Sequence, residues 1–260
     1  MDLAYSAEYE DFRRETRAFL ENHRGQFPKP YGGGRPATDM LAWQKLLIEN
    51  GYAARTIPRV FGGYGAAPDI LKSRIIAEEF TRAKAPTGIA GQGISMLVPT
   101  LLEVGSEEQK RQYIAPTLRG EIIWCQGYSE PGAGSDLASL QTRGVEDGGD
   151  FLINGQKIWT STAQSADMIF CLVRTESERA KHQGISYILF PMTTPGIDVR
   201  PLKTMTGNAE FNEVFFTDVR VPQQNVVGGR GQGWFVANAT LKHERGMLGD
   251  PNAANTRLQA

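Results

Sequence analysis

The residues whose types and spacing could do chemistry concentrate between residues 122 and 161. A strand-like run, Ile-Ile-Trp-Cys-Gln-Gly, leads into Tyr-Ser-Glu-Pro-Gly-Ala-Gly-Ser-Asp at residues 128–136, and Asn-Gly-Gln-Lys-Ile-Trp-Thr-Ser follows at residues 154–161. Glycines let backbone N–H groups approach a ligand that a Cβ atom would push away, and Ser129 and Ser135 add hydroxyl groups beside them. Such a loop suits an anionic or heteroaromatic cofactor. Taken alone it is equally compatible with a tight surface turn, because Pro-Gly is ordinary turn chemistry.

A second candidate is a carboxylate near the end of the sequence. Glu244 lies on an apolar helical stripe, because Trp234, Ala237, Leu241, Glu244 and Leu248 are separated by three or four residues. Burial disfavours the ionised carboxyl group and raises its pKa toward the range of a general base, and Arg245 could orient it. From spacing alone, a solvated or lysine-paired glutamate at the edge of the stripe is the more ordinary interpretation.

The secondary structure that must position these residues is expected to change from helices to strands near residue 121. Before it, apolar periodicity and capping signals predict four or five helices, among them residues 7–23, 39–50 and 69–82. Asp39 is the expected cap of the second of these, and Pro68 is expected in the first turn of the third. Ser106 and Gln109 have the spacing of a capping box. The N-terminal part is therefore expected to be all helical.

After residue 121 the pattern favours strands. Two apolar runs flank Asn154-Gly155, which predicts a hairpin turn there. Further runs occupy residues 168–173, 185–190 and 214–216, and helical spacing returns from Gly233. The sequence therefore predicts an α+β fold. Its expected parts are an N-terminal all-helical domain (1–120), an antiparallel β-sandwich or barrel domain (121–229) and the start of a C-terminal helical bundle (230–260).

Composition excludes some partners. The chain has 260 residues, and its 28 basic and 29 acidic residues give a formal net charge of −1, so no field attracts a nucleic acid or an anionic membrane. No apolar run has membrane-spanning length, and the first residues lack a secretory signal, which predicts a cytoplasmic enzyme with no membrane partner. Cys125 and Cys171 lie in apolar runs and are interpreted as buried thiols. The three histidines are scattered, so no metal site is expected.

Together these segments resemble the flavin-binding region of the acyl-CoA dehydrogenase family. The two motifs at 128–136 and 154–161 carry the resemblance. Residues 61–65, Phe-Gly-Gly-Tyr-Gly, match the family's glycine turn between early helices, and residues 181–186 and 211–216 match its middle β domain. The likeness covers nearly the whole chain. It implies FAD as the cofactor and an acyl-CoA thioester as the substrate.

The resemblance implies an FAD site built from two segments. Backbone of the first segment lines the flavin ring, and its last residues lie near the pyrophosphate. The second segment stacks a tryptophan beside the ring and brings a serine hydroxyl toward N5, although a tryptophan on a strand taken alone is more often a core residue. The implied cofactor residues are Gln126, Gly127, Tyr128, Ser129, Gly134, Ser135, Trp159, Thr160 and Ser161.

The resemblance also makes Glu244 the implied catalytic base. Leu-Lys-His-Glu-Arg at residues 241–245 matches the segment in which members similar to the isovaleryl-CoA and long-chain dehydrogenases carry theirs, whereas most members use a later helix. The implied reaction removes a proton next to the thioester carbonyl while a hydride leaves the next carbon for flavin N5, giving a trans-2-enoyl-CoA. The implied substrate-binding residues are Ser135, Lys242, His243 and Arg245.

The family further implies a role in fatty acid metabolism and lipid degradation, an electron-transferring flavoprotein as acceptor, and a homodimer or homotetramer. Two alternatives stay open: a flavin-dependent oxidase or monooxygenase on the same fold, and a non-catalytic subunit of a heteromeric acyl-CoA dehydrogenase. Because family members carry a longer C-terminal helical bundle, we expect this sequence to be a fragment of a longer protein. The acyl-chain preference is left open.

Overall fold

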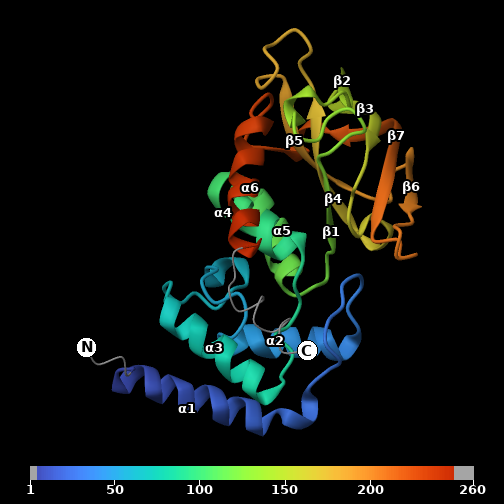
Figure 1. Ribbon diagram of the computed structural model, residues 1–260. Coiled ribbons are helices and arrows are strands. Elements are labelled where there is room, and N and C mark those ends of the chain that lie inside the picture. Colours follow the sequence, from blue (N-terminus) through green and yellow to red (C-terminus); the bar gives the residue numbers. More distant parts are fainter. Residues whose placement is uncertain (1–4, 249–260) are drawn as a thin grey trace. The chain divides into compact units, whose positions relative to one another are not determined.

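The computed structural model describes residues 5–248, with side chains described as far as Glu244 (Figure 1). The chain divides into two compact units, residues 1–90 with 118–121 and residues 91–117 with 122–260. This division follows contacts in space, and the domain boundaries expected at residues 120 and 229 stay predictions. Among the described residues, no helix combines the length and apolar character needed to cross a membrane.

Three α-helices build the first unit: α1 (Ala7–Asn22), α2 (Thr38–Glu49) and α3 (Ile70–Ala83). Each buries part of an apolar face, with Leu20, Leu47 and Ile75 each at 1% exposure or less. The indole of Trp43 is buried and donates to the carbonyl oxygen of Pro86 at 2.8 Å, so this large side chain leaves no unpaired polar atom. The helical nature of this region is confirmed.

Two predicted helix starts are wrong. Asp39 does not cap α2, because that helix begins one residue earlier, at Thr38. Pro68 does not lie in the first turn of α3; Asp69 caps that helix by accepting the backbone N–H of Lys72 at 2.9 Å. Proline has no N–H, so its place just outside the cap leaves the donors of the first turn for the Asp69 carboxylate.

The second unit combines helices with a sheet. A π-helical turn (Gly93–Leu97) leads into α4 (Val98–Val104), followed by α5 (Glu107–Leu118), and α6 (Gly233–Leu248) comes after the sheet. The capping box before α5 is confirmed: Ser106 Oγ accepts the Gln109 N–H, and Gln109 Oε1 accepts the Ser106 N–H, both at 3.1 Å. Thr100 donates to Thr240 at 3.0 Å and so joins α4 to α6.

The sheet has eight strands, which are β1 (Trp124–Gly127), β2 (Arg143–Asp147), β3 (Asp150–Lys157), β4 (Met168–Arg174), β5 (Ile185–Pro191), β6 (Ile197–Leu202), β7 (Phe211–Pro222) and β8 (Val226–Val227). Their order is β6-β7-β3-β2-β4-β5-β8, with β1 paired to β4. Most pairs are antiparallel, as expected, but β1 and β2 both run parallel to β4. The predicted α+β class, with helices followed by a mostly antiparallel sheet, is confirmed.

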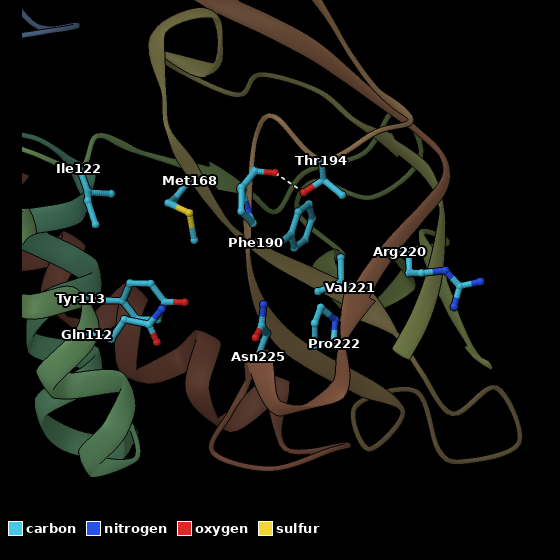
Figure 2. A pocket seen from close by; sticks show the side chains of 11 residues that line it. Gln112, Tyr113, Ile122, Met168, Phe190, Thr194, Arg220, Val221, Pro222 and Asn225 are labelled. Atoms are coloured by element: carbon cyan, nitrogen blue, oxygen red, sulfur yellow. Dashed lines mark hydrogen bonds between the residues drawn. The ribbon is translucent and has the colours of Figure 1, made fainter. Parts of the chain in front are cut away.

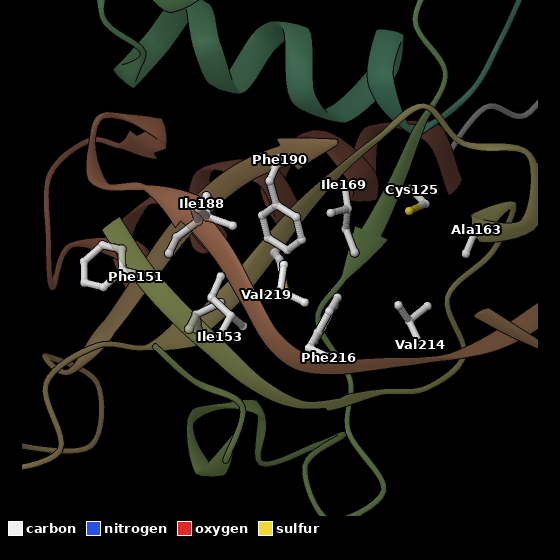
Figure 3. Packing of buried hydrophobic residues seen from close by; sticks show 13 residues of the cluster. Cys125, Phe151, Ile153, Ala163, Ile169, Ile188, Phe190, Val214, Phe216 and Val219 are labelled. Carbon is white, nitrogen blue, oxygen red and sulfur yellow. The ribbon is translucent and has the colours of Figure 1, made fainter. Parts of the chain in front are cut away.

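Strands far apart in this order bury their side chains together (Figure 3). Phe151 of β3 and Phe216 of β7 belong to the same buried cluster as Phe190 of β5, so the sheet curls over its own core. Cys125 and Cys171 lie in this cluster with no exposed surface and no disulfide, which confirms them as buried thiols.

The hairpin turn predicted at Asn154-Gly155 is wrong. The chain turns instead at residues 148–149, and β3 runs straight through 154–155. The register of β3 on β7 shifts between Ile153 and Gly155, where β7 carries the extra residue of a bulge, and a Cβ atom at Gly155 would lie 2.5 Å from Thr142 Oγ1. The Asn154 side chain exchanges two hydrogen bonds with Asp218, at 2.9 and 3.0 Å. Asn154 and Gly155 therefore lie at a bulge in the β3–β7 pair. Position 155 is a glycine because Thr142 leaves no room for a side chain there.

Candidate functional site

The two motif segments meet in the structure. The loop after β1 carries residues 128–136, and the segment after β3 carries residues 158–161. Ile158 donates its backbone N–H to the Ser129 carbonyl oxygen at 2.9 Å, which ties the segments together. Within the loop, Glu130 and Ala133 exchange two backbone hydrogen bonds, at 2.9 and 3.0 Å, so Pro-Gly forms a tight turn between them. The cofactor residues implied by the sequence therefore fall into one region.

A buried ion pair between Lys157 and Glu130 also joins the two segments. Lys157, at 0% exposure, places Nζ 2.8 Å from Glu130 Oε1 and 3.2 Å from the Tyr128 carbonyl oxygen. The Glu130 carboxylate also accepts the backbone N–H groups of Gln141 and Thr142, at 2.5 and 2.9 Å. Burial alone would raise the pKa of Glu130, but Lys157 and these donors outweigh it and hold the pKa below its usual range. Neither residue is among those expected from the sequence, although Lys157 has the same odd-numbered, inward-facing spacing on β3 as Phe151 and Ile153.

Trp159 is exposed to solvent and has a strained backbone conformation. Its side chain is 59% exposed, and its φ of +60° lies in the left-handed region that a bulky residue rarely adopts. Phe211 supports the ring edge-on, with centroids 5.9 Å apart. Such strain persists where the surrounding structure imposes it, and it concentrates at binding sites. An exposed aromatic face held in this way suits stacking on a planar ligand.

Asn212 fixes the residues next to Trp159. Its Nδ2 donates to the carbonyl oxygen of Thr160 at 2.8 Å, and its own carbonyl oxygen accepts the Thr160 N–H at 3.0 Å. Asn212 is fully buried at the start of β7. Thr160 is also buried, and its hydroxyl has no hydrogen-bond partner among the described residues. Ser161 follows half-buried. Asn212 is not among the residues expected from the sequence, where its one visible signal is a polar residue inside an apolar strand.

These features fit a flavin nucleotide. At Gly132 and Gly134 an added Cβ atom would meet nothing within 4 Å, so the backbone of the turn is open to a ligand. Gly134 and Ser135 are both exposed. Gly127 differs, because a Cβ atom there would lie 2.8 Å from Ile169, and its glycine serves packing of β1 on β4. Open turn backbone, an exposed tryptophan and an orphaned buried hydroxyl together match a ligand with a phosphate and an aromatic ring.

Glu244 lies on the face of α6 that carries the fully buried Thr240, and it is half-buried. Burial raises the pKa of Tyr128 well above its usual range, and the Glu244 charge adds to the rise. Lys242 is exposed, and His243 Nε2 lies 3.5 Å from Glu103 of α4. Lys242 and Glu244 therefore differ in exposure, and Glu244 shares the side of α6 that carries the buried Thr240. The side chain of Arg245 lies outside the described residues.

A separate cavity of ≈540 Å³ opens in the second unit (Figure 2). Its walls come from α5 and from the ends of β4, β5 and β7, and they include Tyr113, Met168, Phe190, Val221 and Pro222. None of the residues implied for FAD lines it. Within residues 5–248, no group of three or more His, Cys, Asp or Glu side chains could hold a metal ion.

Comparison with known proteins gives the same family twice. Residues 6–121 match the model of the acyl-CoA dehydrogenase N-terminal domain, and residues 125–219 match that of the middle domain. The chain is 42% identical over 247 residues to Acyl-CoA dehydrogenase IpdE1 of Mycobacterium tuberculosis, covering 92% of this chain and 63% of the relative.

Solved structures are similar over the same part. The Tcur3481-Tcur3483 steroid ACAD superposes with a TM-score of 0.71 at 36% identity, over 94% of this chain and 63% of that one. The ChsE4-ChsE5 complex from Mycobacterium tuberculosis gives a TM-score of 0.71 at 33% identity, over 94% of this chain and 61% of that one. The chain thus spans less than two thirds of the length of these relatives. With its sequence matches, its fold and its loop geometry in agreement, the chain belongs to the acyl-CoA dehydrogenase family.

Proposed function

We propose that the whole protein is an FAD-dependent acyl-CoA dehydrogenase that converts an acyl-CoA thioester to the trans-2-enoyl-CoA. The single observation that carries this proposal is the junction of the two motif segments through Ile158 and Ser129, with Trp159 exposed beside it. The family match and the open backbone at the Pro-Gly turn support it. Bound FAD supplies the hydride acceptor for this reaction.

The residues divide the work between binding and proton transfer. The loop backbone from Gln126 to Ser129 binds the ring edge, and Gly134 with Ser135 lies toward the pyrophosphate. Trp159 would stack beside the ring, and Thr160 and Ser161 would bind it through their hydroxyl groups. Glu244 takes the proton from the carbon next to the thioester carbonyl. A carbon acid of this kind needs a base shielded from water, and a half-buried position on α6 provides part of that shielding.

Substrate contacts are proposed for Ser135, Lys242, His243 and Arg245, which flank the loop or the base in sequence. Ser135 and Lys242 are both exposed, and the contact of Lys242 would be with the charged part of a CoA ester. An electron-transferring flavoprotein is the proposed acceptor, and fatty acid metabolism and lipid degradation are the proposed context. A cytoplasmic location stays a prediction from the sequence.

The proposed assembly is a homodimer or homotetramer. The heteromeric alternative draws support from one structural relative, which was solved as a complex of two different chains. Native mass spectrometry of the whole protein, purified alone and loaded with FAD, separates the two. A homo-oligomer that retains FAD supports the proposal, whereas a protein that needs a second kind of chain to retain FAD supports the alternative.

The function is tested by anaerobic titration of the FAD-loaded whole protein with a panel of acyl-CoA thioesters, following bleaching of the flavin. One thioester should bleach the wild type, and Glu244→Gln should slow bleaching by about 10²–10⁴-fold with FAD still bound. Glu108→Gln, at an exposed position of α5, is the matched control and should behave as wild type. Undiminished bleaching in Glu244→Gln would place the base elsewhere, and no bleaching with any thioester would favour the oxygen-using or non-catalytic alternatives.

A further inference from the structure

Lys157 is a buried cation that the proposed reaction does not use. Its side chain has no exposed surface, and that of Glu130 is 6% exposed. Charges are expensive to take out of water, and a buried ion pair contributes little net stability compared with apolar residues of the same size. A pair of this kind joining two cofactor-binding segments therefore suggests a role other than stabilising the fold.

The contacts of the pair pin consecutive residues of the loop. Lys157 Nζ holds the Tyr128 carbonyl oxygen at 3.2 Å and the Glu130 carboxylate at 2.8 Å. The residue between them, Ser129, is fixed through its carbonyl oxygen by the N–H of Ile158 at 2.9 Å. One restraint comes from Lys157, the last residue of β3, and the other from Ile158, the residue after it. The distance between the loop and the tryptophan is thus set by two consecutive residues.

The far side of the pair is fixed as well. Glu130 accepts the N–H groups of Gln141 and Thr142, at 2.5 and 2.9 Å. These backbone donors cannot rotate away, so the carboxylate has one position, and Lys157 follows it. With every oxygen of the carboxylate engaged, the pair forms a satisfied network, the condition under which buried polar groups rigidify a structure.

The cation also acts on the peptide group that it touches. The peptide bond whose carbonyl belongs to Tyr128 has its N–H on Ser129. A positive donor at the carbonyl end draws electron density and makes the N–H at the other end a stronger donor, because linked hydrogen bonds polarise one another. Ser129 is the residue proposed above to reach the edge of the flavin ring. Lys157 can therefore influence a bound ring without touching it.

We propose that Lys157 and Glu130 are positioning residues for FAD: the pair sets the spacing between the loop at 128–130 and the segment at 159–161, and the Lys157 charge strengthens the Ser129 donor. This assignment rests on the proposed function. It predicts two separable effects of removing the pair. Loss of spacing weakens FAD binding. Loss of the cation at the Tyr128 carbonyl oxygen weakens the Ser129 N–H donor at the ring edge, which makes the two-electron midpoint potential of bound FAD more negative even though the Glu130 charge is removed with it.

The test uses the whole protein with FAD as the probe. Glu130→Gln/Lys157→Met removes both charges at nearly constant size, so no lone charge is buried. Glu130→Asp is the second variant; it keeps both charges but shortens the carboxylate, so contact with Lys157 and with both backbone donors cannot be kept together. Lys45→Met is the matched control, because Lys45 pairs with Glu49 at an exposed site on α2. Far-UV circular dichroism and thermal melting establish folding, calorimetry gives the FAD affinity, and equilibrium reduction gives the potential.

Both variants should fold and bind FAD about tenfold or more weakly, as expected when a charge-supported hydrogen bond is lost. Only the double variant should shift the potential, and Lys45→Met should match wild type in both measurements. Wild-type affinity and potential in the folded double variant would overturn the inference while leaving the proposed function intact. If the double variant fails to fold, wild-type affinity in Glu130→Asp overturns it. A wild type that binds no FAD overturns the function and the inference together.

Discussion

Asn212 and Thr160 hold each other at two points, since Asn212 Nδ2 donates to the Thr160 carbonyl oxygen at 2.8 Å and the Thr160 N–H donates to the Asn212 carbonyl oxygen at 3.0 Å. The first of these contacts depends on the side chain. It anchors the residues beside Trp159 to the start of β7.

Asn212→Ala should therefore lower the free energy of unfolding by about 1–3 kcal/mol, because it leaves a buried carbonyl group without its donor. Chemical denaturation of the whole protein measures this loss. Asn238→Ala, whose amide bonds to Trp234 at an exposed site of α6, should change stability by less than about 0.5 kcal/mol. Equal losses in the two variants would contradict the anchoring role.

Trp159→Ala should weaken FAD binding by about tenfold without destabilising the FAD-free protein, because an exposed ring offers stacking surface but little core packing. Phe235, exposed to the same 59%, is the control, and Phe235→Ala should leave FAD affinity unchanged. Isothermal calorimetry with FAD compares the variants. A loss of thermal stability in Trp159→Ala without FAD would show instead that the ring is a structural residue.

Glu79 should make the first unit acid-sensitive. Although burial alone would raise its pKa, hydrogen bonds from Arg17, Arg13 and Arg82 lower the pKa of Glu79 to about 2. A carboxyl group with a depressed folded-state pKa contributes stability above its unfolded-state pKa, and this stability is lost as the pH falls from about 5 toward 2. The loss should amount to about 2–3 kcal/mol.

Thermal melts of wild type and Glu79→Gln across this pH range check the effect. The variant should be less stable at neutral pH and should show a weaker dependence on pH below 5. Glu49→Gln, which alters an exposed pair on α2, should keep the wild-type dependence. If the stability of Glu79→Gln falls as steeply below pH 5 as that of wild type, other carboxylates cause the loss of stability in acid.

Cys125 and Cys171 should resist alkylation in the folded protein. Burial raises the pKa of Cys171 to about 12 and raises that of Cys125 well above its usual range, so neither forms the reactive thiolate near neutral pH. Peptide mass spectrometry after brief iodoacetamide treatment should find both unmodified, and both modified once the protein is unfolded in urea. Modification of either thiol under native conditions would mean that the β core opens.

Tyr128→Phe should leave the free energy of unfolding unchanged or raise it by up to about 1 kcal/mol. The Tyr128 hydroxyl is buried near Thr240, Tyr187 and Gln126, but it makes no hydrogen bond of normal geometry among the described residues, so its removal relieves a desolvation cost. Tyr187→Phe is the comparison, because the Tyr187 hydroxyl accepts from Thr240 at 3.5 Å. Denaturation curves of both should rank Tyr128→Phe as the more stable. The reverse order would mean that the Tyr128 hydroxyl is satisfied in solution.

Helix positions and the strand runs could be predicted from the sequence because apolar periodicity and capping are local signals. The Ser106–Gln109 box shows this, since four adjacent residues contain all of its partners. Gly155 shows the limit. Asn-Gly favours a hairpin turn locally, but the neighbour that decides the outcome is Thr142, which comes from another part of the chain. The Asn-Gly pair by itself therefore does not distinguish a hairpin turn from a β-bulge.

The residues of the candidate site also fall into those that local sequence signals predict and those that they do not. The residues of the two motifs were found because their glycines, hydroxyls and tryptophan lie in short continuous segments. Lys157, Glu130 and Asn212 were not, because the pairings that give them a role, Glu130–Lys157 and Asn212–Thr160, join residues 27 and 52 positions apart in sequence. A lysine inside a β-strand is read as a surface residue until its partner is known. Roles that depend on long-range pairing cannot be taken from spacing.

The division into compact units has a practical consequence for dissecting the gene. Residues 91–117 match the family's N-terminal domain in sequence but fold with the sheet. Thr117 accepts the indole N–H of Trp124 at 2.8 Å, and the Gln109 amide donates to the carbonyl oxygen of Val226 at 3.0 Å. A fragment cut at the sequence boundary near residue 122 would strip these partners from β1 and β8, so an expression clone for the β half has to start near residue 91.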